Sequence, residues 1–230
     1  MNKLIKLIKS EFEGFGKYET IIFPLLILVI CILSFIAKDN KIALISAICG
    51  IGYTVLAGKG KVLCYFIGIT GTICYSYFAY INGFYGNLAL YALYYIPMEL
   101  IGIFEWNKHL KKNERTIEKT ALTLVERVIY IIVSVVLSLI LLIFLMKLQD
   151  KNPVIDSITT VLSVIGQILT VKRCIEQWYV WFIVNLLSVI MWINAYINGA
   201  ECLATVIMWF VYLLLSIYFL NEWKKELNKK

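Results

Sequence analysis

Long apolar runs, separated by short polar or charged breaks, fill almost the whole chain. A run of about 20 mainly apolar residues is long enough to cross a bilayer as an α-helix. The pattern therefore predicts eight spanning helices, over residues 20–37, 42–57, 62–82, 87–106, 126–146, 155–171, 178–198 and 201–220. The second and sixth runs are short for a membrane about 30 Å thick.

The composition supports the same class of protein. The chain has 230 residues, of which 61% are hydrophobic and 16% are charged, with a mean hydropathy of +0.81. A soluble globular chain is closer to half apolar and a quarter charged. Residues 1–18 lack a compact apolar core ending in a cleavage site, so we expect a basic amphipathic lead-in on the membrane surface. We predict an all-α integral membrane protein.

The basic residues predict the orientation of the spans. With the N-terminus inside, 17 Lys and Arg residues fall in inner segments and four fall in outer loops. Positively charged loops stay on the cytoplasmic side of a membrane, so both termini are expected in the cytoplasm. The net charge of +7 is explained by these inner loops, and no nucleic-acid partner is expected.

Enzyme chemistry has little support in the sequence. The six cysteines are scattered through apolar runs without a C-x-x-C pair, which is typical of small apolar fillers. The only histidine, His109, lies in a basic inner loop. We find no metal-ligand spacing and no phosphate-binding glycine loop, so no enzymatic activity, metal or cofactor is expected.

The chain carries marks of an internal duplication. The sequence AYING occurs at residues 79–83 and 195–199, an offset of 116 that Gly50 and Gly166 share. Trp106 and Trp223 differ by 117 residues. We predict a first three-helix repeat over residues 42–106 and a second over 155–223. A lead-in (1–18) and an extra helix (19–41) precede them, an inner loop with a joining helix (107–154) connects them, and a basic tail (224–230) follows.

The repeats are expected to be parallel. Three helices change sides of the membrane and the joining helix changes back, so both repeats enter from the same face. The tight hairpins at 83–86 and 199–200 are expected on the outside. Transporters built on such repeats bind their solute near the middle of the membrane, between the halves.

Polar and aromatic stripes mark the second repeat. On one helix the stripe consists of Thr160, Ser163, Gln167 and Thr170, and on the next of Trp178, Trp181, Asn185, Ser188 and Trp192. An unpaired amide in hydrocarbon costs roughly 2–7 kcal/mol, so Gln167 and Asn185 are expected to face protein or a cavity. Two interpretations stay open. The stripes could bind a planar, hydrogen-bonding solute, or they could tie helices together and anchor them at the interface.

One acidic residue marks the first repeat. Tyr91, Tyr95 and Glu99 are spaced at i, i+4 and i+8, which places them on one helical face. A carboxylate within a membrane span is costly and is by default a functional candidate. Glu99 could attract a cationic solute or accept hydrogen bonds from ribose hydroxyls; protonation or a structural hydrogen bond is the alternative. Pro97 removes one helix hydrogen bond and is expected to kink the helix.

Several motifs together resemble the PnuC family of bacterial vitamin transporters. They are Y-Y-I-P-M-E-x-x-G-x-x-x-W at 94–106, and T-T-V-L-S-x-x-x-Q, E-Q-W-x-x-W-x-x-x-N and N-E-W-K-K in the second half. The resemblance covers residues 42–225. It implies a core of three, one and three helices similar to SWEET sugar transporters, with an extra N-terminal helix. It also implies a homotrimer in the bacterial inner membrane that takes up nicotinamide riboside by facilitated diffusion, with trapping by cytoplasmic phosphorylation.

The resemblance carries binding roles onto Gln167, Trp178, Trp181 and Asn185. This chain departs from the family at Glu99, where many members have Gln, and at Ile103, where an aromatic residue is common. Other members take thiamine, riboflavin or deoxyribonucleosides, and a carboxylate suits the two cations, nicotinamide riboside and thiamine. The predicted substrate-binding residues are Tyr91, Tyr95, Glu99, Thr160, Gln167, Trp178, Trp181 and Asn185.

We predict a nicotinamide riboside transporter. A thiamine transporter, a non-transporting membrane interaction protein, and a carrier coupled to protons through Glu99 are the alternatives.

Overall fold

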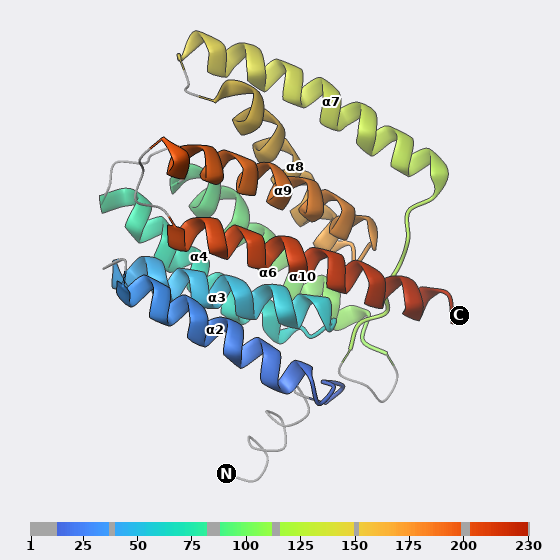
Figure 1. Ribbon diagram of the computed structural model, residues 1–230. Helices are drawn as coiled ribbons and strands as arrows, with labels where there is room; N and C mark the ends of the chain where they lie inside the picture. Colours follow the sequence, from blue (N-terminus) through green and yellow to red (C-terminus); the bar gives the residue numbers. More distant parts are fainter. Residues whose placement is uncertain are drawn as a thin grey trace. The chain divides into compact units, whose positions relative to one another are not determined.

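The computed structural model describes residues 13–36, 40–81, 88–111, 116–149, 152–198 and 203–229, and their secondary structure is helical apart from two isolated β-bridges (Figure 1). The helices are α2 (Glu19–Ile36), α3 (Lys41–Gly58), α4 (Leu63–Ile81), the π-helix η1 (Leu90–Tyr95), α6 (Ile96–Lys108), α7 (Leu124–Lys147), α8 (Pro153–Val171), α9 (Glu176–Ile197) and α10 (Leu203–Leu227). The chain divides into two compact units, Met1–Glu118 and Lys119–Lys230, and each is described by itself.

The prediction of an all-helical membrane protein is confirmed. Six helices among the described residues are long and apolar enough to cross a membrane: α2, α4, α7, α8, α9 and α10. The predicted span over 42–57 corresponds to α3, whose apolar part is Leu44–Gly58, and the span over 87–106 corresponds to η1 followed by α6. Most of the lead-in and both outer hairpins lie outside the described residues.

One predicted helix end is wrong by about two turns. The last helix was expected to stop at Leu220, where the apolar run ends, but α10 continues to Leu227. Trp223 is fully buried, and Lys225 Nζ lies 3.0 Å from Glu222 Oε1 one turn earlier. Packing and an ion pair thus extend the helix into part of the predicted basic tail.

The helices of the first unit pack in chain order. Helix α2 packs on α3, α3 on α4, and α4 on both η1 and α6. The α3–α4 contact is close because a Cβ added at Gly71 would lie 2.7 Å from Cys49 Cβ. Ser46 Oγ donates a hydrogen bond to Gly71 O at 3.1 Å across the same contact. The small residue and the interhelical bond are typical of packing inside a membrane.

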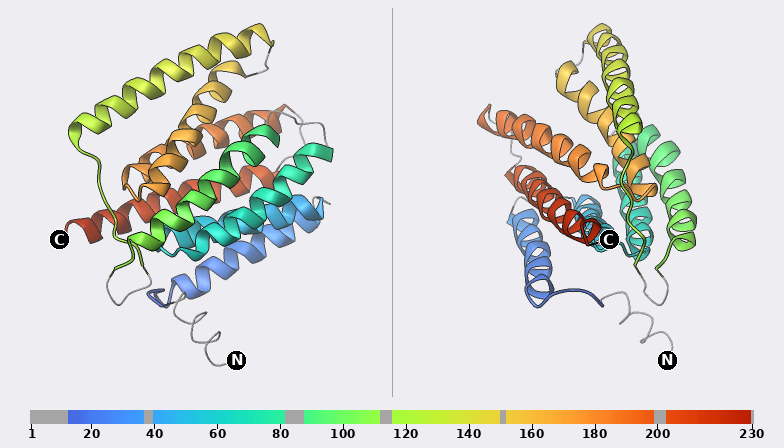
Figure 2. Two further views of the ribbon diagram at one scale, coloured as in Figure 1. Left: turned by 180° about the vertical axis from the view of Figure 1, so that it is seen from behind. Right: turned by 90° about the vertical axis from the view of Figure 1, so that its right-hand side faces the viewer.

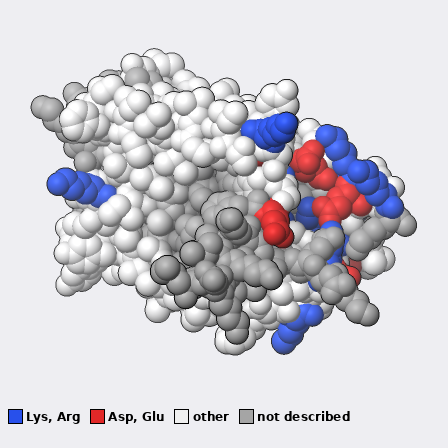
Figure 3. All heavy atoms as spheres, turned by 90° about the horizontal axis from the view of Figure 1, so that it is seen from below, with Lys and Arg blue, Asp and Glu red and all other residues white. Residues whose placement is uncertain are grey.

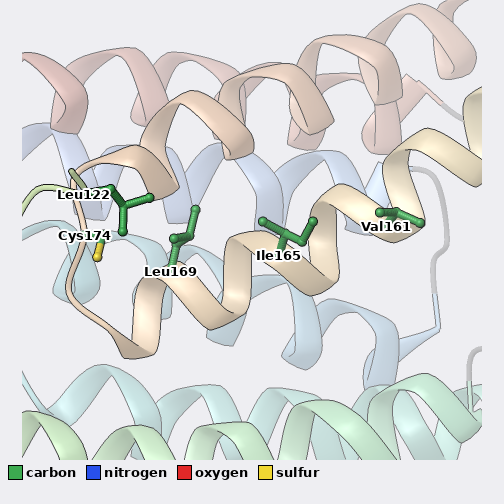
Figure 4. Close-up of a cluster of buried hydrophobic side chains, with 5 residues drawn as sticks. All are labelled: Leu122, Val161, Ile165, Leu169 and Cys174. Carbon is green, nitrogen blue, oxygen red and sulfur yellow. The ribbon is translucent and has the colours of Figure 1, made fainter. Parts of the chain in front are cut away.

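The second unit also packs in chain order, with α7 on α8, α8 on α9 and α9 on α10. Its core lies along α8, where Val161, Ile165 and Leu169 recur at every fourth residue and meet Leu122 and Cys174 near the helix end (Figure 4). Helix α7 lies beside the start of α8 and diverges from it along its length (Figure 2).

Helix α7 has the surface of a lipid-facing helix. It begins with a capping box, in which Thr123 and Glu126 each bond the other's backbone. Its apolar window has a mean hydropathy of 3.2 and contains no buried residue. On the face drawn in Figure 3, charged side chains gather mainly at one end, and the rest of the described surface there is largely uncharged. Such surfaces suit contact with acyl chains.

One hydrogen bond recurs in both units. Thr54 Oγ1 donates to Gly50 O at 2.9 Å in α3, and Thr170 Oγ1 donates to Gly166 O at 2.8 Å in α8. Both pairs share the offset of 116 residues seen in the sequence. The duplication and its parallel arrangement stay predictions.

Candidate functional site

A buried carboxylate lies at the centre of the first unit. Glu99 is in the first turn of α6 and is 4% exposed, which agrees with the expected interior position. Thr72 Oγ1 of α4 donates a hydrogen bond to Glu99 Oε1 at 3.1 Å. Glu99 Oε2 is buried and has no hydrogen-bond partner among the described residues. A buried carboxylate with one unsatisfied oxygen is a candidate binding group.

A glycine makes room for this carboxylate. A Cβ added at Gly68, one turn before Thr72 on α4, would lie 2.7 Å from Glu99 Oε1 and 2.7 Å from the Tyr53 ring. Both distances are shorter than real Cβ contacts allow. Gly68 therefore permits the side chain of Glu99 to reach the surface of α4.

The segment that precedes Glu99 and α6 is the π-helix η1. The Ile96 backbone N–H bonds to Tyr91 O, five residues earlier. The structure shows a widened turn just before Pro97, and the kink expected at this proline stays a prediction. Pro97 has no N–H to continue the α-helical ladder, and a π turn accommodates the missing donor. Short π-helical segments are frequent at functional sites.

The π-helix gathers tyrosine rings. The rings of Tyr91 and Tyr95 lie 5.0 Å apart, and Tyr75 of α4 lies 4.2 Å from Tyr91. All three are half-buried. The predicted residues Tyr91, Tyr95 and Glu99 thus lie along successive turns of η1 and α6, opposite α4.

On the C-terminal side of Glu99, α6 packs tightly against α4. Tyr65 of α4 and Trp106 of α6 are both fully buried, with their rings edge to face at 4.9 Å. A Cβ added at Gly102 would lie 2.3 Å from Tyr65 Cζ. This aromatic pair fixes α6 against α4 just beyond the carboxylate.

In the second unit, Trp181 packs against α8. Its ring is within 3.1 Å of a Cβ built at Gly166, and its Nε1 donates a hydrogen bond to Thr170 Oγ1 at 3.2 Å. Gln167 and Asn185 are both buried, and Thr160 is half-buried two turns before Gln167. The structure thus groups Trp181 with Thr170 of the α8 stripe and with Gly166 of the same helix.

Trp178 faces a different neighbour. Its ring lies 5.3 Å from Phe219 and 5.8 Å from Trp223, both on α10. Its Nε1 is buried without a hydrogen-bond partner among the described residues. Lys119 Nζ lies 4.8 Å from the centre of the Trp223 ring and forms an ion pair with Glu226. Sequence spacing placed both tryptophans on one face, but α9 lies between α8 and α10, and each indole contacts a different helix.

Sequence reasoning missed the contribution of α4. Gly68, Thr72 and Ser76 recur at every fourth residue within the apolar run of residues 62–82. That spacing puts them on one face. It was the available signal, but only the packing of α4 on α6 reveals that this face meets Glu99.

The chain matches the family model described as nicotinamide mononucleotide transporter over residues 40–225. The nicotinamide riboside transporter PnuC of Haemophilus influenzae is 30% identical over 225 residues, which covers 96% of both chains. The protein of the same name from Neisseria mucosa is 29% identical over 226 residues, covering 96% of this chain and 86% of the relative.

The fold agrees with this assignment. A crystal structure of the vitamin B3 transporter PnuC superposes with a TM-score of 0.81 at 29% identity, covering 96% of this chain and 97% of that one. The expected family is confirmed. The chain belongs to the nicotinamide mononucleotide transporter family, which includes the PnuC proteins, and it is a membrane transporter rather than an enzyme.

Proposed function

We propose that this protein carries nicotinamide riboside across the bacterial cytoplasmic membrane by facilitated diffusion. Two relatives that align over 96% of this chain are named riboside transporters. The observation that carries the proposal for this chain is the buried Glu99 carboxylate, one oxygen of which has no partner among the described residues. A cationic solute offsets the cost of such a charge within the membrane.

The same carboxylate favours the riboside over the mononucleotide. The mononucleotide adds a phosphate, which a nearby carboxylate repels and which needs Lys, Arg or a helix N-terminus to bind. In the helices that the structure describes, Lys and Arg occur in the terminal turns, such as Arg127 at the start of α7 and Lys147 at its end. The riboside has no phosphate, and its pyridinium ring is positive.

The second unit offers the groups that a pyridinium carboxamide requires. Trp181 is half-buried, packs against Gly166 and donates a hydrogen bond to Thr170. Stacking of the cationic ring on an indole contributes roughly 2 kcal/mol when the pair is desolvated. We assign the amides of Gln167 and Asn185 to the carboxamide and the ribose. Trp178 Nε1 is a further buried donor.

In this proposal the solute equilibrates across the membrane, and phosphorylation in the cytoplasm traps it. Both termini face the cytoplasm, as the basic loops predict, and the assembly is a homotrimer. The mass of the detergent-solubilised protein by light scattering tests the assembly.

Thiamine is the second candidate, because it is also a cation and Glu99 suits it equally. Competition uptake separates the two. An excess of unlabelled thiamine should leave riboside uptake unchanged, whereas equal competition would make thiamine an alternative substrate.

Two variants test the proposed site. Trp181→Ala and Asn185→Ala should abolish saturable uptake of labelled nicotinamide riboside while the protein is still expressed and folded. Trp209→Ala and Asn194→Ala are matched controls, since these residues lie outside the proposed set, and they should keep uptake near the wild-type rate. Wild-type uptake by the Trp181 and Asn185 variants would remove both residues from the site.

A further inference from the structure

Two hydroxyl groups of α4, those of Thr72 and Ser76, behave differently from most others in the described helices. Serine and threonine within a helix usually donate to the carbonyl three or four residues earlier. Eight described residues do so, at distances of 2.6–3.0 Å: Thr20, Thr54, Thr70, Ser134, Ser157, Thr159, Thr170 and Ser216. Thr72 instead donates to Glu99, and Ser76 Oγ is buried with no hydrogen-bond partner among the described residues.

Three α4 residues, Gly68, Thr72 and Ser76, form one row, and the first two of them meet this carboxylate. Residues four apart on a helix are neighbours on its surface. Gly68 leaves space for Glu99 Oε1, and Thr72 binds that oxygen. Ser76 is one turn further along the same face and is 8% exposed. The row therefore fixes one oxygen of Glu99 and carries a second buried hydroxyl, that of Ser76, one turn beyond Thr72.

Two buried oxygens are left without partners among the described residues, Glu99 Oε2 and Ser76 Oγ. A buried polar atom without a partner is costly, so native structures usually supply one. The carboxylate oxygen accepts hydrogen bonds and attracts positive charge, and the serine hydroxyl both donates and accepts. A ligand that satisfies both oxygens combines a positive charge with a hydroxyl group.

We propose that Glu99 Oε2 and Ser76 Oγ form a polar subsite for an organic cation that bears a hydroxyl, with Thr72 as a positioning residue. This inference rests on the proposed function and adds to it. Ser76 is a further substrate-binding residue, on α4, and the negative charge of Glu99 selects a charged ring over an uncharged ring of similar shape. Thr72 acts through Glu99, because its hydrogen bond to Oε1 directs Oε2 toward the ligand.

Two substrate analogues isolate the two interactions. The reduced 1,4-dihydro form of nicotinamide riboside has nearly the same outline but no ring charge, and deoxyribosides lack one ribose hydroxyl. Binding of the riboside and of both analogues is measured with the purified full-length protein in detergent. The affinity for the oxidised riboside divided by that for the reduced riboside is the charge ratio. In Glu99→Gln, which keeps the shape of the side chain, this ratio should fall about tenfold, as expected for the loss of one charge-assisted contact.

Ser76→Ala should weaken riboside binding about fivefold, the effect of one neutral hydrogen bond. It should have little effect on the one deoxyriboside that lacks the bonded hydroxyl. Thr72→Val should lower the charge ratio, as Glu99→Gln does. Thr72→Ser, which keeps the hydroxyl, should have the charge ratio of the wild type. The matched control is Thr70→Ala, because Thr70 is on the same helix, is exposed and bonds only to Phe66 O in its own helix.

The outcomes separate this inference from the proposed function. If the wild type binds no riboside, the proposed function fails and the subsite fails with it. If the wild type binds riboside but Ser76→Ala and Thr72→Val match Thr70→Ala, or Glu99→Gln leaves the charge ratio unchanged, only the subsite is overturned. Thermal unfolding of every variant identifies any that is misfolded, and Thr72→Ser supplies a folded comparison for Thr72→Val.

Discussion

Substitution of Gly102 by alanine is expected to destabilise the first unit. The added Cβ would lie 2.3 Å from Tyr65 Cζ and 2.7 Å from its hydroxyl oxygen. The tyrosine ring cannot move away easily, because it is fully buried and packs edge to face on Trp106. Overpacking of this kind costs about 1–3 kcal/mol, and the better helix propensity of alanine offsets up to about 1 kcal/mol of it.

The net loss should lower Tm by several degrees. For a chain of about 200 residues, 1 kcal/mol corresponds to about 2–4 °C. Thermal unfolding of the detergent-solubilised protein, followed by intrinsic fluorescence, measures the shift. Gly52→Ala is the matched control, since its Cβ would meet Ile67 Cγ2 at 3.4 Å, an ordinary contact. That variant should be as stable as the wild type or slightly more stable, and equal Tm values for the two variants would refute the packing argument.

Two further predictions concern the second unit. Thr170→Val removes the acceptor of the Trp181 indole hydrogen bond, which is worth about 1 kcal/mol. The KM for riboside uptake should therefore rise about fivefold, while Thr170→Ser should keep a KM close to that of the wild type. An unchanged KM in the valine variant would exclude this role. Burial raises the pKa of the Cys174 thiol above its usual range, so less reactive thiolate is present at pH 8. In a variant with the other cysteines replaced by alanine, a water-soluble maleimide should label Cys174 slowly in the folded protein and rapidly after denaturation, and equal rates would contradict its buried position.

The helices could be predicted from the sequence because membrane spans are encoded by long apolar runs. The burial of Glu99 followed from its place within such a run. The end of α10 did not, because Trp223 is buried by partners that are distant in the sequence. Apolar patterning locates the lipid-facing part of a helix and does not locate the helix end beyond the membrane.

The residue groupings were harder to predict. Trp178 and Trp181 share a face by spacing, but packing gives them different partners, on α10 and on α8. Ser76 has the sequence appearance of an ordinary helical serine that bonds to its own backbone. Only the packing of α4 on α6 reveals that Thr72 of the same row reaches a carboxylate. At Pro97 the missing N–H was evident from the sequence, but the π turn that precedes it was not.

Uptake of labelled nicotinamide riboside by liposomes that contain only the purified protein tests the central proposal most directly. Without an ion gradient or ATP, we expect saturable entry that stops when the internal and external concentrations are equal, and unlabelled riboside on the other side should accelerate exchange. Entry no faster than into protein-free liposomes would contradict transport of this solute. Accumulation that appears only with a proton gradient would contradict facilitated diffusion.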